Sequence, residues 1–248
     1  MKTVIFAAGL GTRLKPLTDT MPKALVPLAG KPLLQWQVEK LRDAGITDII
    51  VNVHHFPDMI IDSIRANQAW GCNIMISDER NQLLDTGGGL KKMYHAQLIK
   101  PDEPILACNV DILSNIDIKA LIAQYEKAGI SQVVVSDRQT QRYLLFDEQN
   151  YLCGWTNIAT GEIKPSSIRQ SIIPSLRKLA FSGMQILGPE VLEYLKEMKE
   201  EKFSLIPFYL QIMDRVNLQA YIPSDYRMMD VGKIDQISEA EAFAESLQ

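Results

Sequence analysis

Cysteine is scarce in this chain of 248 residues, with Cys72, Cys108 and Cys153 far apart. Their spacing matches neither a zinc site nor a redox CxxC motif, and it argues against a disulfide framework. A chain of this length buries roughly 70–75% of its unfolded surface on folding, so it needs no covalent or metal brace. Cys108 lies in an apolar run, and we expect it to be a buried filler rather than a nucleophile.

Long apolar runs and a basic excess are also missing. No segment approaches the roughly 18 apolar residues that span a bilayer, and the start MKTVIFAAG lacks the features of a secretory signal. The net charge of −4 argues against nucleic acid as the main partner, because binding to its backbone needs dense positive charge. We therefore expect a cytoplasmic protein that binds neither membrane nor nucleic acid, with an undetermined oligomeric state.

Strand and helix patterns alternate through residues 1–136. The expected strands are 3–8, 48–53, 73–77, 104–108 and 131–136, and the expected helices are 32–44, 57–70, 88–96 and 117–128. The first of these strands, 3–8, is a continuous apolar run, which is typical of a strand buried on both faces of a parallel sheet. This alternation predicts an α/β fold: a Rossmann-like, doubly wound mixed sheet, mostly parallel, in three layers, with ligands at the C-terminal edge of the strands.

The rhythm changes after residue 136. Residues 143–146 and 151–155 flank a polar turn and predict an antiparallel hairpin. Further strands are expected at 178–187 and 218–222, with helices at 189–199, 203–213 and 235–247. No linker or repeat separates the two halves, so we expect a single domain, 1–248, in which the second half extends the first sheet.

The loop after the first strand has the composition of a phosphate-binding turn. Gly9 and Gly11 allow close backbone approach and positive φ, and Arg13 adds a charge that can grip two phosphate oxygens. The third glycine of a dinucleotide-binding GxGxxG motif would fall at Leu14, and the GxxxxGK[ST] pattern is absent. A purely structural turn is the alternative. Lys23 follows in a proline-stiffened segment that suits a fixed cation.

Residues 9–34, GLGTRLKPLTDTMPKALVPLAGKPLL, resemble the signature of the sugar-1-phosphate nucleotidyltransferases, also called nucleoside-diphosphate-sugar pyrophosphorylases. Weaker similarity continues to the C-terminus. The resemblance implies the nucleotide-diphospho-sugar transferase type of fold, with a nucleotide-binding half at 1–136 and a sugar-phosphate-binding half at 137–248. It implies nucleotide contacts from Ala8, Gly9, Gly11, Thr12, Arg13, Lys23, Asp85, Thr86, Gly87, Gly88 and Asn109.

Two aspartates are the expected ligands of a Mg²⁺ cofactor. Asp111 follows an apolar strand run at the ligand edge of the sheet, where spacing alone slightly favours a turn or capping role. Within the resemblance, Asn109–Val110–Asp111 stands at the family's N-G-D triplet, and Asp230 stands in its late Asp–[Val/Ile]–Gly–Thr segment. Val110 replaces the glycine, and Lys233 replaces the threonine. The bulk of Val110 near the phosphates is a departure that bears on activity.

The segment DTGGG at 85–89 is the second glycine-rich feature. Three glycines at a helix start cost about 1 kcal/mol each relative to alanine, so we expect close approach of the backbone to a base and ribose. The segment most resembles the branch of N-acetylmuramate-1-phosphate uridylyltransferases and mannose-1-phosphate guanylyltransferases. UTP or GTP is therefore the expected nucleotide.

The sugar side is harder to read. Ser182 and Gly183, with Asn109, are the expected sugar contacts by resemblance, while a strand with a glycine bulge is the alternative. Residues 162–165, EIKP, do not match the family's Glu-Lys-Pro, whose lysine holds the sugar phosphate. His54 and His55 lack nearby metal-ligand partners, and we expect them to be structural.

Together these features predict Mg²⁺-dependent transfer of a nucleoside monophosphate from a nucleoside triphosphate to a sugar 1-phosphate, with release of pyrophosphate. Arg13, Lys23 and Asp111 are the expected catalytic residues, acting by position and charge. Two alternatives remain open: a phosphocholine cytidylyltransferase of the same fold, and a non-catalytic nucleotide-sugar sensor, which the departures at Val110 and Lys233 motivate.

Overall fold

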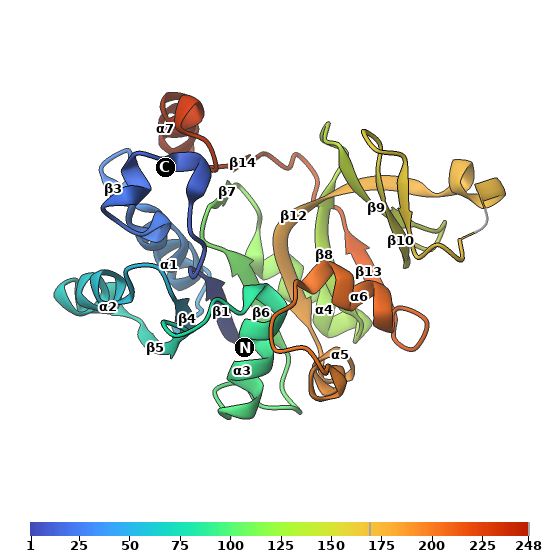
Figure 1. Cartoon of the computed structure of the whole chain (residues 1–248), viewed down its shortest axis with the longest axis horizontal. Helices are drawn as coiled ribbons and strands as arrows, with labels where there is room; N and C mark the ends of the chain where they lie inside the picture. The colour runs from blue at the N-terminus through green and yellow to red at the C-terminus, as the bar shows by residue number, and fades with distance from the viewer. Residues whose placement is uncertain (169, 248) are drawn as a thin grey trace.

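The structure is a computed structural model that describes residues 1–168 and 170–247 (Figure 1). The strands of its main sheet are β1 (Lys2–Phe6), β4 (Asp48–Val53), β5 (Asn73–Asp78), β6 (Ile105–Asn109), β8 (Ser131–Ser136), β9 (Arg142–Phe146), β10 (Leu152–Asn157), β11 (Glu162–Lys164), β12 (Arg177–Leu187) and β13 (Leu218–Tyr221). The α-helices are α1 (Leu33–Asp43), α2 (Pro57–Ala66), α3 (Asp85–His95), α4 (Ile118–Ala128), α5 (Pro189–Leu192), α6 (Leu205–Ile212) and α7 (Ile237–Glu245).

The sheet has a parallel part and an antiparallel part. Strands β5, β4, β1 and β6 are parallel neighbours, as the alternating pattern predicts. Strand β12 then joins β6 in antiparallel register, and β8 pairs with β12 rather than with the earlier parallel strands. Strand β13 lies parallel to β8, and β9, β10 and β11 continue from the first residues of β12. Strands from both halves of the chain therefore form one mixed sheet.

Side chains alternate between two apolar clusters on the two faces of this sheet. In β1, Ile5 packs into the first cluster, while Val4 and Phe6 pack into the second. The first cluster receives buried residues of α1, α2, α4 and α7, and the second receives those of α3, α5 and α6. This arrangement confirms the expected three-layer α/β/α fold.

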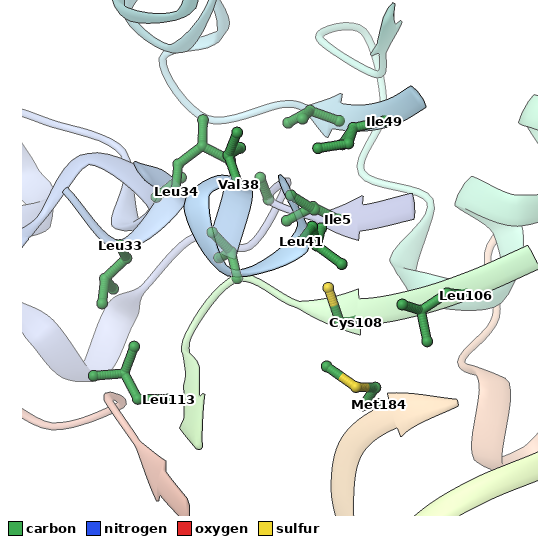
Figure 2. Close-up of a cluster of buried hydrophobic side chains, with 14 of the residues drawn as sticks. Ile5, Leu33, Leu34, Val38, Leu41, Ile49, Leu106, Cys108, Leu113 and Met184 are labelled. Carbon is green, nitrogen blue, oxygen red and sulfur yellow. The ribbon is translucent and has the colours of Figure 1, made fainter. Parts of the chain in front are cut away.

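Helix α1 supplies much of the first cluster (Figure 2). Its buried residues Leu34, Val38 and Leu41 recur at helical spacing and pack with Ile5 of β1 and Cys108 of β6. Each such fully buried side chain contributes roughly 1.5–3 kcal/mol by removal from water. Cys108 is 1% exposed, and burial raises the pKa of its thiol to about 12, which fits an apolar filler.

A separate two-stranded ribbon lies beyond the C-terminal end of β6. Strand β7 (Ile112–Ser114) pairs antiparallel with β14 (Met228–Asp230), with Asp230 opposite Ile112. Helix α1 holds β7 through Gln37, whose Nε2 donates to the carbonyl oxygen of Ile112 at 2.6 Å, and through Lys40, whose Nζ donates to that of Ser114 at 2.6 Å. The ribbon brings together a segment near the middle of the chain and one near its C-terminus.

Several element boundaries differ from the sequence prediction. Helix α2 ends at Ala66 because Gln68, Ala69 and Trp70 have positive φ. Helix α5 stops at Leu192 and continues as a 3₁₀ helix, and α3 begins at Asp85, so the glycine triplet lies inside the helix. In the described ranges, no helix is long and apolar enough to cross a membrane.

Candidate active site

The glycine loop after β1 is built around Gly11. This residue has φ +65° and precedes a 3₁₀ turn over Thr12–Leu14. Its carbonyl oxygen accepts hydrogen bonds from the Leu14 N–H at 2.8 Å and the Thr18 hydroxyl at 2.9 Å. A Cβ at Gly11 would lie 2.7 Å from Thr18 Cγ2 and 3.0 Å from Lys23 Cβ. Both backbone conformation and space therefore require glycine here.

Gly9 is a different case. It has no positive φ, and a Cβ there would meet no atom within 4 Å. The sequence-based argument for positive φ thus holds at Gly11 and not at Gly9. Gly9 instead leaves the backbone open toward the neighbouring pocket, as close approach of a ligand requires.

A pocket of about 300 Å³ lies at the C-terminal ends of β1, β4 and β6. Among the residues predicted from sequence, the pocket is lined by Ala8, Gly9, Lys23, Asp85, Thr86, Asn109 and Asp111. Phe6, Asn52, Leu83 and Val110 complete its wall and were not predicted as ligand contacts. Thr12, Arg13, Gly11 and Asp230 are outside this lining, at or near the loop beside it.

Two cations and two carboxylates converge beside the pocket. Lys23 is 8% exposed, and its ammonium forms an ion pair with Asp111 Oδ2. The Val231 N–H donates to the Asp111 carbonyl oxygen at 2.8 Å, which brings Asp230 to the same place. A Cβ at Gly232 would lie 2.7 Å from Asp230 Oδ1 and 2.8 Å from Arg13 Nη2, so the guanidinium and the carboxylate both pack against that glycine.

The electrostatics of this cluster fit a divalent cation. Asp230 is an exposed residue, yet the surrounding walls partly withdraw its carboxylate from water, and this desolvation, followed by the charge of Asp111, raises its pKa above the usual range. Lys23, Arg13 and Arg138 act in the opposite direction. A cation between the carboxylates would relieve their repulsion, and carboxylate oxygens are ligands that Mg²⁺ prefers. Within 1–168 and 170–247 no three His, Cys, Asp or Glu side chains form a metal cage, so further ligands would come from phosphate or water.

The fold accommodates Val110 without a strained backbone, and an effect of its bulk on activity stays a prediction. Its φ is not positive, its N–H donates to the Phe6 carbonyl at 3.2 Å, and it is 3% exposed within the first apolar cluster. The backbone here needs no glycine. The branched side chain packs into the first apolar cluster and also borders the pocket. Lys233, the other departure from the family pattern, is an exposed residue three positions after Asp230.

The glycine triplet requires a correction to the sequence-based argument. A Cβ at Gly87 would lie 2.4 Å from the Phe203 ring, and one at Gly88 would lie 2.2 Å from the Glu201 carbonyl oxygen. The N–H groups of Gly87 and Gly88 both donate to the Phe203 carbonyl, at 2.9 and 3.0 Å. These glycines make room for the chain's own residues 201–203 and do not line the pocket. A nucleotide contact at Gly87 and Gly88 stays a prediction that needs this segment to move.

Asp85 and Thr86, which do line the pocket, are held by the same part of the chain. Ser204 Oγ donates to Asp85 Oδ2 at 2.6 Å, and the Leu205 N–H donates to Thr86 Oγ1 at 3.1 Å. Lys91 fixes the segment further through an ion pair with Glu201 at 2.8 Å. The second half of the chain therefore supports one wall of the pocket.

On the sugar side, Ser182 and Gly183 are both buried residues of β12, and neither lines the pocket. Gly183 has φ +71° at a register shift of β12, and a Cβ there would lie 3.1 Å from Asn109 Nδ2. It is thus a bulge glycine that also borders a pocket residue. Ser182 is fully buried, because the alternation of the strand turns its side chain into the interior. Ser182 does not line the pocket, so the expected contact of its hydroxyl with a sugar stays a prediction.

Two residues near the sugar side had no signal in the sequence. Arg138 Nη2 donates to the Phe181 carbonyl at 3.1 Å, and its charge acts on Asp230. Burial raises the pKa of Tyr226, whose hydroxyl lies near Ser182 and Ser114. Asn52 could have been noticed as the single polar side chain within the apolar residues 49–53.

The two histidines have structural partners. His54 Nδ1 is 2.7 Å from the Glu79 carbonyl oxygen, and His55 Nε2 is 3.0 Å from that of Thr18. Each ring nitrogen thus holds a loop backbone, in agreement with the sequence interpretation.

Comparison with known proteins agrees with this geometry. The nucleotidyl transferase family model matches residues 2–246. The N-acetylmuramate α-1-phosphate uridylyltransferase of Caulobacter vibrioides is 30% identical over 218 residues, covering 84% of this chain and 83% of that protein. The enzyme of the same name from Neisseria meningitidis serogroup B is 30% identical over 244 residues, covering 98% of each.

A solved structure supports the fold. The crystal structure of a UDP-glucose pyrophosphorylase complexed with UDP-glucose superposes with a TM-score of 0.76 at 21% identity, covering 100% of both chains. Family match, relatives and fold all agree with the resemblance seen in residues 9–34. The chain belongs to the nucleotidyl transferase family, and it is an enzyme of the sugar-1-phosphate nucleotidyltransferase type.

Proposed function

We propose that this chain transfers uridine monophosphate from UTP to a sugar 1-phosphate of the N-acetylmuramate class, with Mg²⁺ held by Asp111 and Asp230. The observation that carries the proposal is the convergence of Lys23, Arg13 and the two aspartates beside the pocket after β1. The names of the two relatives and the DTGGG segment support uridine and the amino sugar acid. We also propose a cytoplasmic location, where nucleoside triphosphates are supplied.

The chemistry needs no general base from the protein. A phosphate monoester has a second pKa near 6, so the sugar phosphate is largely ionised at pH 7. Its oxygen attacks the α-phosphorus, an O–P bond forms, and the bond to the β-phosphate oxygen breaks, so that pyrophosphate leaves with the electron pair. Catalysis then consists of holding the two anions in line and neutralising their charge.

The residues divide this work by position. The open backbone at Gly9 and the Gly11 turn would receive the triphosphate, with Arg13 neutralising the leaving phosphates. Lys23 lines the pocket beside Asp111, where it would neutralise charge at the α-phosphate. The carboxylates of Asp111 and Asp230 would hold Mg²⁺, which supplies Lewis-acid stabilisation of the phosphate oxygens when bound.

The test is a pyrophosphate-release assay with each nucleoside triphosphate against a panel of sugar 1-phosphates and phosphocholine. We expect the highest kcat/KM with UTP and N-acetylmuramate 1-phosphate, and no release without a divalent cation. Preference for GTP with mannose 1-phosphate, or for CTP with phosphocholine, would overturn the substrate assignment. Nucleotide binding without pyrophosphate release from any acceptor would favour the sensor alternative.

A further inference from the structure

We propose that Glu79 is a positioning residue that ties together the two walls of the nucleotide pocket through its two carboxylate oxygens. The inference rests on the proposed function insofar as the pocket is taken to bind a nucleotide. Glu79 follows β5 directly and is 1% exposed. Since it does not line the pocket, it would act through the groups that it holds.

The first oxygen reaches the wall formed by the glycine loop. Asn52 Nδ2 donates to Glu79 Oε1 at 2.8 Å, and Asn52 Oδ1 accepts from the Ala7 N–H at 2.7 Å. Ala7 is followed at once by Ala8 and Gly9, which line the pocket. The orientation of the Asn52 amide therefore sets the backbone at the start of the loop, and Glu79 sets the orientation of that amide.

The second oxygen reaches the opposite wall. The Leu84 N–H donates to Glu79 Oε2 at 3.3 Å, and Leu84 stands between Leu83 and Asp85, both of which line the pocket. One buried carboxylate thus spans from the loop after β1 to the start of α3. These two segments are far apart in the sequence, so the hydrogen bonds of Glu79 help to define the distance between them.

The packing leaves little freedom to this pair. Asn52 is 2% exposed, and a Cβ at Gly89 would lie 2.9 Å from Glu79 Oε1 and 3.2 Å from Asn52 Nδ2. The third glycine of the triplet therefore accommodates the Asn52–Glu79 pair, as the first two accommodate residues 201–203. This gives a reason for a glycine that faces neither the pocket nor the solvent.

A carboxylate is the group that this arrangement needs. Both oxygens of Glu79 accept hydrogen bonds from donors, Asn52 Nδ2 and the Leu84 N–H. Glutamine has the same shape, but its NH₂ group would face one of those two donors and could not accept a hydrogen bond from it. A buried donor without an acceptor is costly, so the Glu79→Gln variant should displace one wall of the pocket.

The experiment measures nucleotide binding directly by calorimetry, with UTP and no sugar phosphate, in the wild type and the Glu79→Gln variant. We expect Kd for UTP to rise by about 10–100-fold, since loss of a buried charged hydrogen bond is of that order. In the pyrophosphate assay KM for UTP should rise while KM for the sugar phosphate is unchanged. A general loss of structure would raise both KM values.

Glu190→Gln is the matched control. Glu190 Oε1 accepts from the N–H and hydroxyl of Ser131, at the start of α5 and away from the pocket. This variant should lose stability without a change in Kd for UTP. If Glu79→Gln behaves in the same way, its carboxylate is merely structural and the proposal is wrong.

Asn52→Leu provides a second, independent route should Glu79→Gln fail to fold. It removes the amide that connects Glu79 to the Ala7 N–H, and we expect the same rise in Kd. Where Glu79→Gln does fold, the double variant should show a smaller rise in Kd than the sum of the separate effects, because both substitutions break one chain of contacts. Fully additive effects on Kd would contradict the proposal that Glu79 and Asn52 act through one chain of contacts.

The binding measurement also separates this inference from the proposed function. Wild-type binding of UTP without turnover of any acceptor would overturn the enzymatic proposal, while a weaker Kd in Glu79→Gln would still support the positioning role. Absence of nucleotide binding in the wild type would overturn both.

Discussion

The Val231 N–H donates to the carbonyl oxygen of Asp111 at 2.8 Å, and this bond closes the β7–β14 ribbon next to both candidate metal ligands. Residue 111 lies in the turn between β6 and β7, and residue 230 belongs to β14 near the C-terminus. Neither side chain position is defined by its own segment alone. The pairing of the two strands is what places the two carboxylates within each other's field.

Asp111→Ala and Asp230→Ala should therefore each reduce turnover strongly. Loss of one preorganised charged group at a transition state typically costs about 10²–10³ in kcat. We expect at least that loss in pyrophosphate release from both variants. Asp230→Ala should keep an unfolding temperature close to that of the wild type, because Asp230 is an exposed residue. Asp111→Ala should also lower the unfolding temperature, because it leaves the buried Lys23 ammonium without its partner. Asp214→Ala, at an exposed position, is the control.

Chelation of divalent ions gives an independent check on the same pair. Wild-type turnover should vanish with EDTA and return with added Mg²⁺. The Asp111→Ala variant should need a higher Mg²⁺ concentration for its residual activity. Turnover equal to that of the wild type in either alanine variant would remove the metal assignment.

The two glycines of the phosphate loop should respond differently to alanine. At Gly9 a methyl group meets open space at an ordinary φ, so the fold should tolerate it while the KM for the nucleotide rises. At Gly11 the methyl meets Thr18 and the Lys23 Cβ at a φ of +65°, so both stability and kcat should fall. Gly161→Ala is the control, with a φ of +73° but open space.

Urea unfolding and steady-state kinetics separate these outcomes. Positive-φ strain alone should cost of order 1 kcal/mol in Gly161→Ala, with unchanged turnover. Gly11→Ala should lose more, because Lys23 must also shift. An unchanged KM in Gly9→Ala would mean that the nucleotide does not approach the loop at that point.

Much of the fold could be predicted from local sequence. The apolar residues of β1, β4 and β6 indicate buried strands, and the apolar stripe of α1 sets the face on which it packs. The insertion of β12 between β6 and β8 could not be predicted, because strand order depends on long-range pairing. Neither β7 nor β14 has a pattern of its own, since each spans three residues.

The candidate site divides in the same way. Gly11 and Arg13 lie in a short continuous segment whose composition is informative by itself. Asp230 could be paired with Asp111 through family resemblance and not through spacing. The glycine triplet is recognisable in the sequence as unusual, but its partners, Phe203 and Glu201, lie more than a hundred residues away, so the local sequence does not show what the glycines make room for.

Gly88→Ala tests this reassignment of the triplet. Its methyl group would lie 2.2 Å from the Glu201 carbonyl oxygen, so the 201–205 segment must move away from α3. Overpacking of this kind costs about 1–3 kcal/mol, and the hydrogen bonds to the Phe203 carbonyl would weaken as well. We expect a lower urea midpoint and faster proteolysis within that segment. Unchanged stability would contradict the close packing.

Lys40 gives a prediction for the pH dependence of stability. Burial lowers the pKa of its ammonium from 10.5 to about 8, while its Nζ donates to the Ser114 carbonyl and hydroxyl oxygens at 2.6 and 2.8 Å. Between pH 8 and 10.5 the unfolded chain holds a proton on Lys40 that the folded chain has lost. The free energy of unfolding attributable to this group therefore rises with pH across that window and is constant below it.

Comparison with a variant that cannot titrate isolates this contribution. In Lys40→Met the rise should be absent, so the wild type should gain stability relative to the variant as pH increases from 8 to 10.5 in urea unfolding. Lys127→Met, at an exposed position on α4, should keep the wild-type pH dependence. A neutral amine still donates two hydrogen bonds to Ser114, so the β7 ribbon should stay in place and turnover at alkaline pH should not collapse through this residue. Parallel pH curves for the wild type and Lys40→Met would show that the lysine is ionised throughout in the folded chain.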